Sequence, residues 1–524
     1  MKRDSNFGEI NLDVRAGQGS PKGLADDETS FRIALVGNFS GADHMSSGRR
    51  VDLGARQPIA VDRDNFDEVL AKIQPAIRLP AGGNAADEIL TFSELDDFHP
   101  DRLFQRSVMF RRLRDLRERL QDPGGLSSVL EELGIGSSAP SRGAEEKEPG
   151  RGMQTAADAA SLASGNLLDD MIAQTESQGG EASARRIDGL QEFLQRATTA
   201  HTVAAADPRQ AQVLAVIDRA LGLQMRSLLH FPPLQALEAA WRAAFLLVRR
   251  GRTSPELKLY LLDISQEELA ADLLASSDLR QCGAYRLLVE KTVGTAGAEP
   301  WALLAGNFTF GPRGEDAELL GRIAKVAHAA GAVFLAEASP ALLGCQSLAA
   351  TPDFQDWRDA FPDEGAASAW KSLRSAAEAA HVGLALPRLL LRLPYGKETD
   401  PIETFSFEEM PDAPAHEDYL WGNPSFACAL LLAESFAEDR WQMQPGQHLE
   451  IDRLPLHVVG VDEQTQTQPC AEALITEHTA ENILEKGFMP LASMKDQDVV
   501  RVVRFQSIAD PLRPLAGPWM IRRG

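Results

Sequence analysis

A stretch of low complexity divides the chain into two parts. Residues 134–160 read GIGSSAPSRGAEEKEPGRGMQTAADAA and hold almost no large apolar side chain, so we expect a flexible linker there. Residues 1–27 have a similar composition and are expected to form a disordered tail. The chain has 524 residues, and a single core stops growing at roughly 250–300 residues. At least two domains therefore follow.

The part before the linker, residues 28–133, alternates between strand and helix patterns. FRIALVG (31–37) is an apolar run typical of a strand, and DNFDEVLAKIQPAIRL (64–79) repeats apolar residues at the spacing of an amphipathic helix. DEILTFSEL (87–95) again alternates like a strand, and one long Arg-rich helix is expected from Pro100 to Leu120. This order predicts an α/β domain over residues 28–133.

The part after the linker begins with helical patterns over residues 161–250 and continues as an α/β domain over residues 251–524. Short β-type runs bounded by turn or charge signals predict four strands, LKLYLLDI (257–264), YRLLVEK (285–291), PWALLAG (300–306) and AVFLAEAS (332–339). We therefore predict an α/β fold with two lobes, each with a mixed sheet, plus a helical segment and a flexible linker.

One pattern occurs in both parts. FRIALVGNFSG (31–41) and EPWALLAGNFTFG (299–311) each place Gly-Asn-Phe and a hydroxyl residue after an apolar run. We interpret both as a buried strand that ends at a glycine, with the asparagine supporting a turn and the phenylalanine folding back as an apolar plug. The candidate turn residues are Gly37, Asn38, Phe39, Gly306, Asn307 and Phe308.

The charge of the chain limits its partners. A net charge of −23 and a pI near 4.9 argue against binding to nucleic acid or anionic lipid. No window has the roughly 18 apolar residues that a membrane span requires, and the N-terminus lacks the apolar core of a secretory signal. We expect a soluble cytoplasmic protein.

A search for catalytic, cofactor and metal motifs finds none. Neither Gly-Asn-Phe stretch matches a phosphate-binding loop, and the four cysteines are widely spaced. The densest candidate is HEDYLWGNPSFACALLLAESF (416–436), where a hydrolase site is conceivable from His416 to Cys428, but its aromatic and leucine residues favour core packing. We predict no catalytic residue, cofactor or metal ion.

Two surfaces leave alternatives open, because an apolar stripe beside the linker either docks on the body of the chain or waits for a partner, and an Arg-rich face is solvated by default. NLLDDMIA (166–173), next to the linker, places one apolar stripe on a short helix, made of Leu167, Leu168, Met171 and Ile172. RLFQRSVMFRRLRDLRERL (102–120) has seven arginines and two acidic residues, so it is locally basic within an acidic chain. Its basic face is either solvated or docked on an acidic neighbour.

Several of these strings resemble the subunits of the bacterial type VI secretion contractile sheath. The first part resembles the small subunit (TssB, or VipA) in FRIALVGNFSG, VDRDNFDEVLAKIQPAIRL and LTFSELDDFHPDRLFQRSVMFRRLRDLRERL. Residues 160–510 resemble the large subunit (TssC, or VipB) in SLLHFPPLQALEAAWRAAFLLV, LKLYLLDISQEELAADL, EPWALLAGNFTFGPRGEDAELLGRIAKVAHAAGAVFLAEASP, VGLALPRLLLRLPYG and HEDYLWGNPSFACALLLAESF. The chain thus resembles two sheath subunits fused in one polypeptide.

The resemblance implies a structural protein. Sheath subunits polymerise around an inner tube of Hcp protein, exchange strands with neighbouring subunits and shorten to drive the tube outward. The resemblance further implies contacts with other sheath subunits or copies of the chain, with baseplate proteins and with the ClpV AAA+ ATPase. ClpV grips a helix near the start of the large subunit, which corresponds to NLLDDMIA here.

One departure from the family pattern leaves an alternative open. Large subunits continue well beyond the segment equivalent to VVRVVRFQSIADP into a β-rich region, whereas this sequence ends soon after it, at Gly524. A non-polymerising accessory, cap or starter protein of the same apparatus is the alternative to a sheath component. An enzyme built around His416 to Cys428 is a more distant one.

Overall fold

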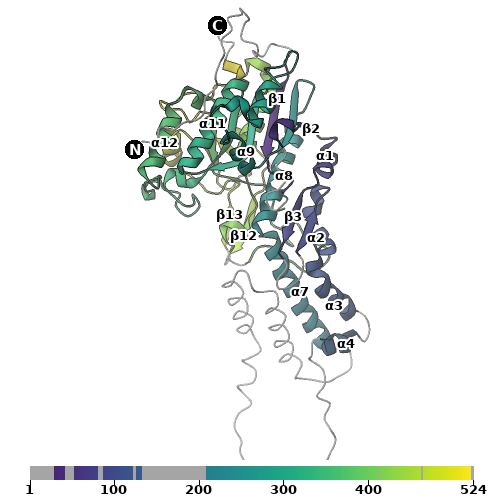
Figure 1. Ribbon diagram of the computed structural model, residues 1–524. Helices are drawn as coiled ribbons and strands as arrows, with labels where there is room; N and C mark the ends of the chain where they lie inside the picture. The colour runs from purple at the N-terminus through teal and green to yellow at the C-terminus, as the bar shows by residue number, and fades with distance from the viewer. Residues whose placement is uncertain are drawn as a thin grey trace, which may run out of the picture.

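A computed structural model describes residues 29–41, 52–80, 87–121, 125–132, 208–411, 414–461 and 464–520 (Figure 1). We call residues 29–132 the N-terminal segment and residues 208–520 the C-terminal segment. A broad α/β lobe contains most of the C-terminal segment, and a helical arm extends from it. The arm consists of α2 (Pro100–Arg106), α3 (Arg111–Gln121), α4 (Gly125–Glu132) and α7 (Pro208–Leu229).

One nine-stranded sheet forms the centre of the lobe, in the order β11-β15-β14-β8-β7-β6-β1-β5-β2. The six strands from β14 to β5 run parallel, and the strands at both edges are antiparallel to their neighbours. Their bounds are β1 Phe31–Gly37, β2 Ile59–Val61, β5 Leu257–Asp263, β6 Leu303–Phe310, β7 Val333–Ala338, β8 Val382–Leu386, β11 Glu450–Ile451, β14 Met489–Ser493 and β15 Val500–Val502.

Helices cover both faces of this sheet, which explains why its strands read as almost continuous apolar runs. Ile33 and Leu35 of β1 belong to the core on one face, and Ala34 and Val36 belong to the core on the other. The first core includes residues of α8 (Pro232–Arg250) and α13 (Pro424–Asp439). The second includes residues of α9 (Gln266–Leu273), α11 (Gly314–Ala330), α12 (Glu364–Ser375) and α14 (Glu477–Glu485).

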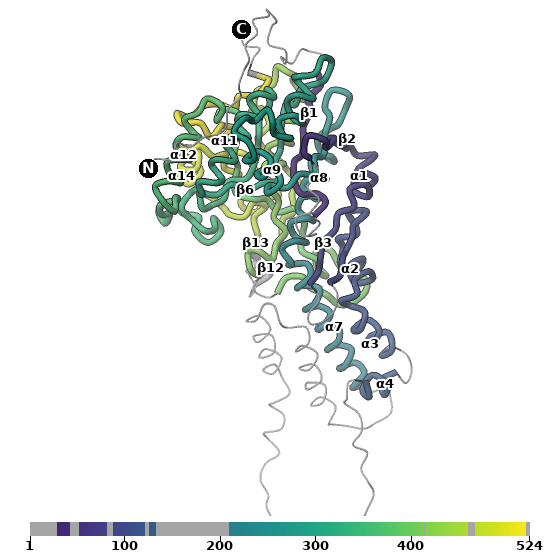
Figure 2. Tube along the Cα trace, in the orientation of Figure 1, coloured from purple at the N-terminus to yellow at the C-terminus, as the bar shows by residue number. Residues whose placement is uncertain are grey.

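The N-terminal segment also forms a small unit beside α8 and α7 (Figure 2). It contains α1 (Phe66–Ile73) and the antiparallel pair of β3 (Ala76–Leu79) and β4 (Glu88–Thr91). Two further antiparallel pairs lie in the C-terminal segment, β9 (Leu389–Leu390) with β10 (Trp421–Gly422) and β12 (His457–Val461) with β13 (Gln464–Gln468).

The predicted strand YRLLVEK (285–291) is wrong. The chain forms a short helix, α10 (Gly283–Tyr285), that continues into a π-helical turn at Arg286–Glu290. Asp272 explains the difference, because its carboxylate accepts hydrogen bonds from the backbone N–H groups of Gly283 and Ala284 and so caps the first turn. A short buried apolar run does not by itself distinguish a strand from a helix.

The predicted continuous helix from Pro100 to Leu120 is interrupted. Ser107 separates α2 from a 3-10 turn at Val108–Phe110, and α3 follows. Glu88 of β4 accepts hydrogen bonds from the Ser107 hydroxyl at 2.9 Å and the Val108 N–H at 2.7 Å. This tertiary contact fixes the interruption.

The predicted α/β fold class is confirmed, with one sheet that includes strands of both segments. The N-terminal segment contributes β1 and β2 to the sheet formed by the C-terminal segment, so the two expected lobes share a core. The predicted domain boundaries remain predictions. Within the described ranges, no helix is both long enough and apolar enough to cross a membrane.

Candidate functional site

The junction between the two segments is the candidate functional site, because its central element, β1, has partners from the other segment on both sides. Phe31 to Gly37 pair in parallel with Leu257 to Asp263 of β5. On the other edge, Ile33 to Val36 pair with Leu303 to Gly306 of β6. A strand bonded along both edges is held more firmly than any edge strand.

The turn after β1 is bound by the C-terminal segment. β1 ends at Gly37, and the backbone N–H groups of Phe39 and Ser40 donate to one carboxylate oxygen of Asp263, at 2.8 and 2.9 Å. Phe39 is fully buried and lies edge-on to Trp241, whose indole N–H donates to the Phe39 carbonyl at 2.9 Å. The turn therefore joins β1 to α8 as well as to β5.

The second Gly-Asn-Phe stretch lies beside the first but differs in structure. Val36 pairs with Gly306, so the two similar stretches are on neighbouring strands. The prediction that the second strand ends at Gly306 is wrong, since β6 continues to Phe310 with an irregular register after Ala305. The Asn423 amide donates to the Phe308 carbonyl, and the Ser425 hydroxyl donates to the Gly306 carbonyl. These side chains satisfy backbone oxygens in the irregular stretch.

Both glycines are required by close packing. A Cβ atom at Gly37 would lie 2.8 Å from the Cβ of Asn307 on the neighbouring strand. A Cβ atom at Gly306 would lie 2.8 Å from a ring carbon of Phe334 on β7. Such distances are shorter than real carbon contacts. The lack of a side chain at Gly37 therefore leaves room for Asn307 of β6, and the lack of one at Gly306 leaves room for the Phe334 ring of β7.

A buried ion-pair network beside α8 supports the junction. The Arg392 guanidinium donates to Glu238 at 2.8 Å and to both carboxylate oxygens of Glu409, at 2.7 and 2.9 Å. Arg242 donates to the same oxygen of Glu238 and to the Tyr395 hydroxyl. Two arginines thus balance two carboxylates that are 0% and 1% exposed.

The charge of Glu409 depends on this network. Burial alone would raise the pKa of Glu409, but Arg392, together with the nearby His230 and the hydrogen bond from the Tyr395 N–H, brings it to about 2. His99 of the N-terminal segment packs edge-on against the ring of Tyr395 at 4.9 Å. The network therefore contacts the N-terminal segment through Tyr395.

Further polar contacts join the segments along the helical arm. Asp101 at the start of α2 accepts hydrogen bonds from the Thr404 hydroxyl and from the N–H groups of Glu403 and Thr404. Arg117 of α3 pairs with Asp218 of α7 at 2.7 Å. The loop around residue 404 thus holds the start of α2, while the ion pair fixes α3 on α7.

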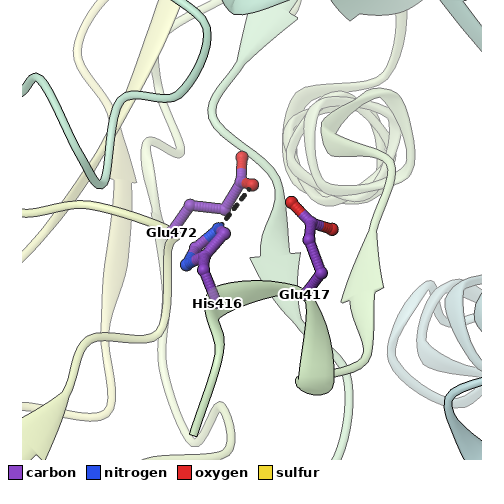
Figure 3. A group of neighbouring side chains, drawn as sticks. All are labelled: His416, Glu417 and Glu472. Atoms are coloured by element: carbon purple, nitrogen blue, oxygen red, sulfur yellow. Dashed lines mark hydrogen bonds and ion pairs between the residues drawn. The ribbon is translucent and has the colours of Figure 1, made fainter. Parts of the chain in front are cut away.

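A second polar cluster contains the His416 stretch (Figure 3). His416, Glu417 and Glu472 place potential ligand atoms within 4.8 Å of one another. The guanidinium of Arg388 already bonds Glu472 at 2.8 Å and Glu417 at 3.0 Å, and His416 bonds Glu472 at 3.0 Å. This guanidinium already bonds both carboxylates, so the arrangement is that of an ion-pair cluster and fits poorly with a metal site.

The other residues of the conceivable hydrolase site do not support nucleophilic chemistry. Cys428 is fully buried in α13, and burial raises its pKa to about 12. Burial would raise the pKa of Glu472, but His416 and Arg388 lower it to about 2, which keeps this group a charged acceptor. The Cys428 thiol, with its raised pKa, is a poor nucleophile at neutral pH.

Glu337 of β7, next to this cluster, gives a testable pH dependence. Burial raises its pKa to about 7 despite the nearby Arg388, so the folded protein binds a proton that the unfolded chain releases near the ordinary glutamate pKa of 4.5. The free energy of unfolding should therefore fall as pH rises from about 4.5 to about 7. At roughly 1.4 kcal/mol per pKa unit, the loss is up to about 3 kcal/mol.

Glu337→Gln is expected to remove this loss. The variant should gain stability relative to the wild type as pH rises from 5 to 8, as measured by urea unfolding at several pH values. Glu485→Gln, at an exposed position of α14, is the matched control and should show no such change. If the difference in free energy of unfolding between Glu337→Gln and the wild type were the same at pH 5 and pH 8, Glu337 would not be the group that causes the pH dependence.

The apolar stripe of Leu167, Leu168, Met171 and Ile172 lies outside the described residues. The residues that hold the junction together were not predicted as site residues. Asp263 is the last residue of the apolar strand β5, and Arg392 lies inside the apolar run LPRLLLRLPYG (386–396). A charged residue within such a run is the sequence signal that could have indicated a buried ion pair.

Comparison with known proteins relates each segment to a different protein family. Residues 211–509, more than half of the chain, match the VipB (EvpB) tail sheath N-terminal domain. Residues 10–130 match the family described as type VI secretion system VipA or Hcp2. The type VI secretion system sheath protein TssC1 of Pseudomonas aeruginosa is 33% identical over 307 residues, which cover 57% of this chain and 61% of that protein.

Proposed function

Since the chain belongs to the type VI secretion tail sheath family and joins its VipA and VipB parts in one polypeptide, we propose that it is a structural component of a contractile sheath. In this proposal residues 28–133 act as the small subunit and residues 161–524 as the large subunit, with residues 134–160 as the linker. The chain assembles with copies of itself or with other sheath subunits around an inner tube and transmits contraction.

The position of β1 between β5 and β6 is the observation that carries the proposal. The VipA-like segment supplies a central strand of the VipB-like sheet, so one chain holds a VipA-like part and a VipB-like part in fixed proportion. To pull the segments apart along the strand, the hydrogen bonds on both edges of β1 must break. Such a joint is suited to transmit force without separating.

Imaging of assemblies tests the proposal. The purified protein, alone and mixed with the Hcp inner-tube protein, is examined by negative-stain electron microscopy. Tubular or helical polymers, with a diameter that accommodates the inner tube, are expected. Monomers under all conditions would contradict a sheath function and favour a non-polymerising accessory protein. Pull-downs with baseplate proteins would then separate an accessory protein from one unrelated to the apparatus.

We propose that the stripe of Leu167, Leu168, Met171 and Ile172 binds the ClpV ATPase. Leu168→Asp with Met171→Asp is expected to abolish binding in a pull-down, because each carboxylate removes apolar contact area and would be desolvated in the complex. Ala173→Asp adds a charge on the face of the predicted helix opposite the stripe and is the control that should retain binding. Unchanged binding by the double variant would assign ClpV recognition elsewhere.

A cytoplasmic location and the lack of an enzymatic role belong to the same proposal. Support comes from the sheath family and from the ion-paired state of the His416 cluster. His416→Ala should leave assembly intact. A catalytic activity that is lost in His416→Ala, with assembly unchanged, would restore the enzyme hypothesis.

A further inference from the structure

An exposed patch on the N-terminal segment combines apolar and basic side chains. Val108 and Met109 of the 3-10 turn are 52% and 39% exposed. Arg111 and Arg112, which begin α3, are exposed and form no ion pair with another described residue. We call these four residues the basic patch. Other arginines of α3 differ, since Arg117 and Arg119 pair with Asp218 and Glu132.

The fold presents the basic patch rigidly. Phe110 is fully buried and anchors the turn from below, and Glu88 bonds the Ser107 hydroxyl and the Val108 N–H. Because these contacts hold the backbone of the turn, the turn loses little further backbone entropy when it docks. The patch therefore has the properties of a protein-binding surface.

A complementary surface lies in the C-terminal segment, in residues 352–364 between β7 and α12. Asp356 and Asp359 are exposed and form no ion pair with a described residue, and Phe361, between Asp359 and the start of α12, is 37% exposed. We call residues 352–364 the acidic loop. It is also held firmly, because the Trp357 indole N–H donates to the Thr351 carbonyl and the Arg358 N–H donates to the Gly344 carbonyl.

The two surfaces lie on opposite sides of the molecule. In Figure 1, α12, which begins at the end of the acidic loop, is at the left edge, whereas α2 and α3, on either side of the basic patch, are at the right edge. The loop therefore cannot fold onto the patch of its own chain. Two different complementary surfaces on opposite sides generate an open, repeating contact between copies.

We propose that the basic patch of one copy docks on the acidic loop of the next copy, with Arg111 and Arg112 facing Asp356 and Asp359, and Val108 and Met109 facing Phe361. The proposal rests on the proposed sheath function, which requires a repeating contact between copies. A second copy is the partner, because the same chain carries both complementary surfaces. Two basic patches repel one another, as do two acidic loops, so the favoured contact joins the patch of one copy to the loop of another. Salt should weaken the contact, since the charges are exposed.

Cysteine cross-linking tests the contact directly. The four native cysteines are buried, so cross-links should form only at introduced ones. Met109→Cys and Phe361→Cys chains, mixed and treated with a short thiol cross-linker, should form a cross-linked dimer. Each variant alone should form almost none. No dimer in the mixture, or equal dimer in either variant alone, would overturn this head-to-tail contact.

Charge reversal tests the same contact in the full chain. R111E/R112E and D356R/D359R should each weaken self-association by roughly tenfold or more in sedimentation, and the chain with all four changes should regain it. K397E/K495E reverses two exposed lysines outside both surfaces and is the control, with the same charge change as R111E/R112E. Circular dichroism verifies that each variant is folded.

The outcomes separate this contact from the proposed function. Wild-type polymers that persist unchanged in both reversal variants would refute the contact while the sheath function stands. A wild type that stays monomeric would refute both. Two other outcomes would show a non-specific charge effect and would also refute the contact. In the first, both reversal variants lose self-association and the fourfold variant does not regain it. In the second, the lysine control loses as much self-association as the reversal variants.

Discussion

Leu35→Asp is expected to unfold both segments together. Leu35 is fully buried at the middle of β1, where it pairs with Leu261 of β5 on one side and Ala305 of β6 on the other. A carboxylate at this position would be removed from water and surrounded by apolar side chains, which costs several kcal/mol. Since ordinary proteins are stable by only about 5–15 kcal/mol, little stability would remain.

The measurement is thermal and urea unfolding followed by circular dichroism, together with hydrogen exchange. Leu35→Met, which conserves volume, should cost less than about 1.5 kcal/mol. Ala60→Asp, at an exposed position of the edge strand β2, should be nearly neutral. If Leu35→Asp abolished exchange protection in residues 29–132 but left β6, β7 and β8 protected, the two segments would be separate folding units and the shared core would be refuted.

The strands at the centre of the fold could be predicted from the sequence because each is an apolar run with turn signals on both sides. FRIALVG, LKLYLLDI and AVFLAEAS correspond to β1, β5 and β7. Their order in the sheet could not be predicted, because β1 is far from β5 and β6 in sequence and a strand buried on both faces has no pattern that identifies its neighbours. The shared core is therefore visible only in the structure.

The errors have a common physical cause, which is that a distant side chain decides the local conformation. Asp272 caps the helix where a strand was predicted, and Glu88 ends α2 where a longer helix was predicted. The irregular register of β6 after Gly306 similarly depends on donors from Asn423 and Ser425. Local patterns in the sequence do not contain these partners.

The buried ion pairs of the junction could not be predicted either, because the sequence pattern around each residue does not contain its partner. Glu238 and Glu409 have no feature that links them to Arg392 in the sequence, and they are 154 and 17 residues away from it along the chain. The structure brings them together beside Tyr395. Their contribution can be measured, because removing one member leaves the others charged and buried.

Arg392→Met is expected to destabilise the protein by about 3–5 kcal/mol. The change keeps most of the apolar volume but removes the guanidinium that bonds Glu409 at 2.7 and 2.9 Å, and one of two that bond Glu238. Glu409, which has almost no exposure, would then lack its arginine, and Arg242 alone would have to balance two buried carboxylates. Breaking one side of such a pair is costly. Urea unfolding at neutral pH measures the loss.

The pH dependence and a second substitution identify the cause. With Arg392 present, the pKa of Glu409 is about 2, so its stabilising contribution is complete above the ordinary pKa of 4.5 and is lost as pH falls toward 2. Without Arg392 the effect of burial prevails, the pKa of Glu409 rises, and the variant should become less stable as pH rises above 4.5. Adding Glu409→Gln to Arg392→Met should recover part of the loss at neutral pH. If the double variant were as unstable as Arg392→Met at every pH, lost packing would explain the effect and the buried charge would not.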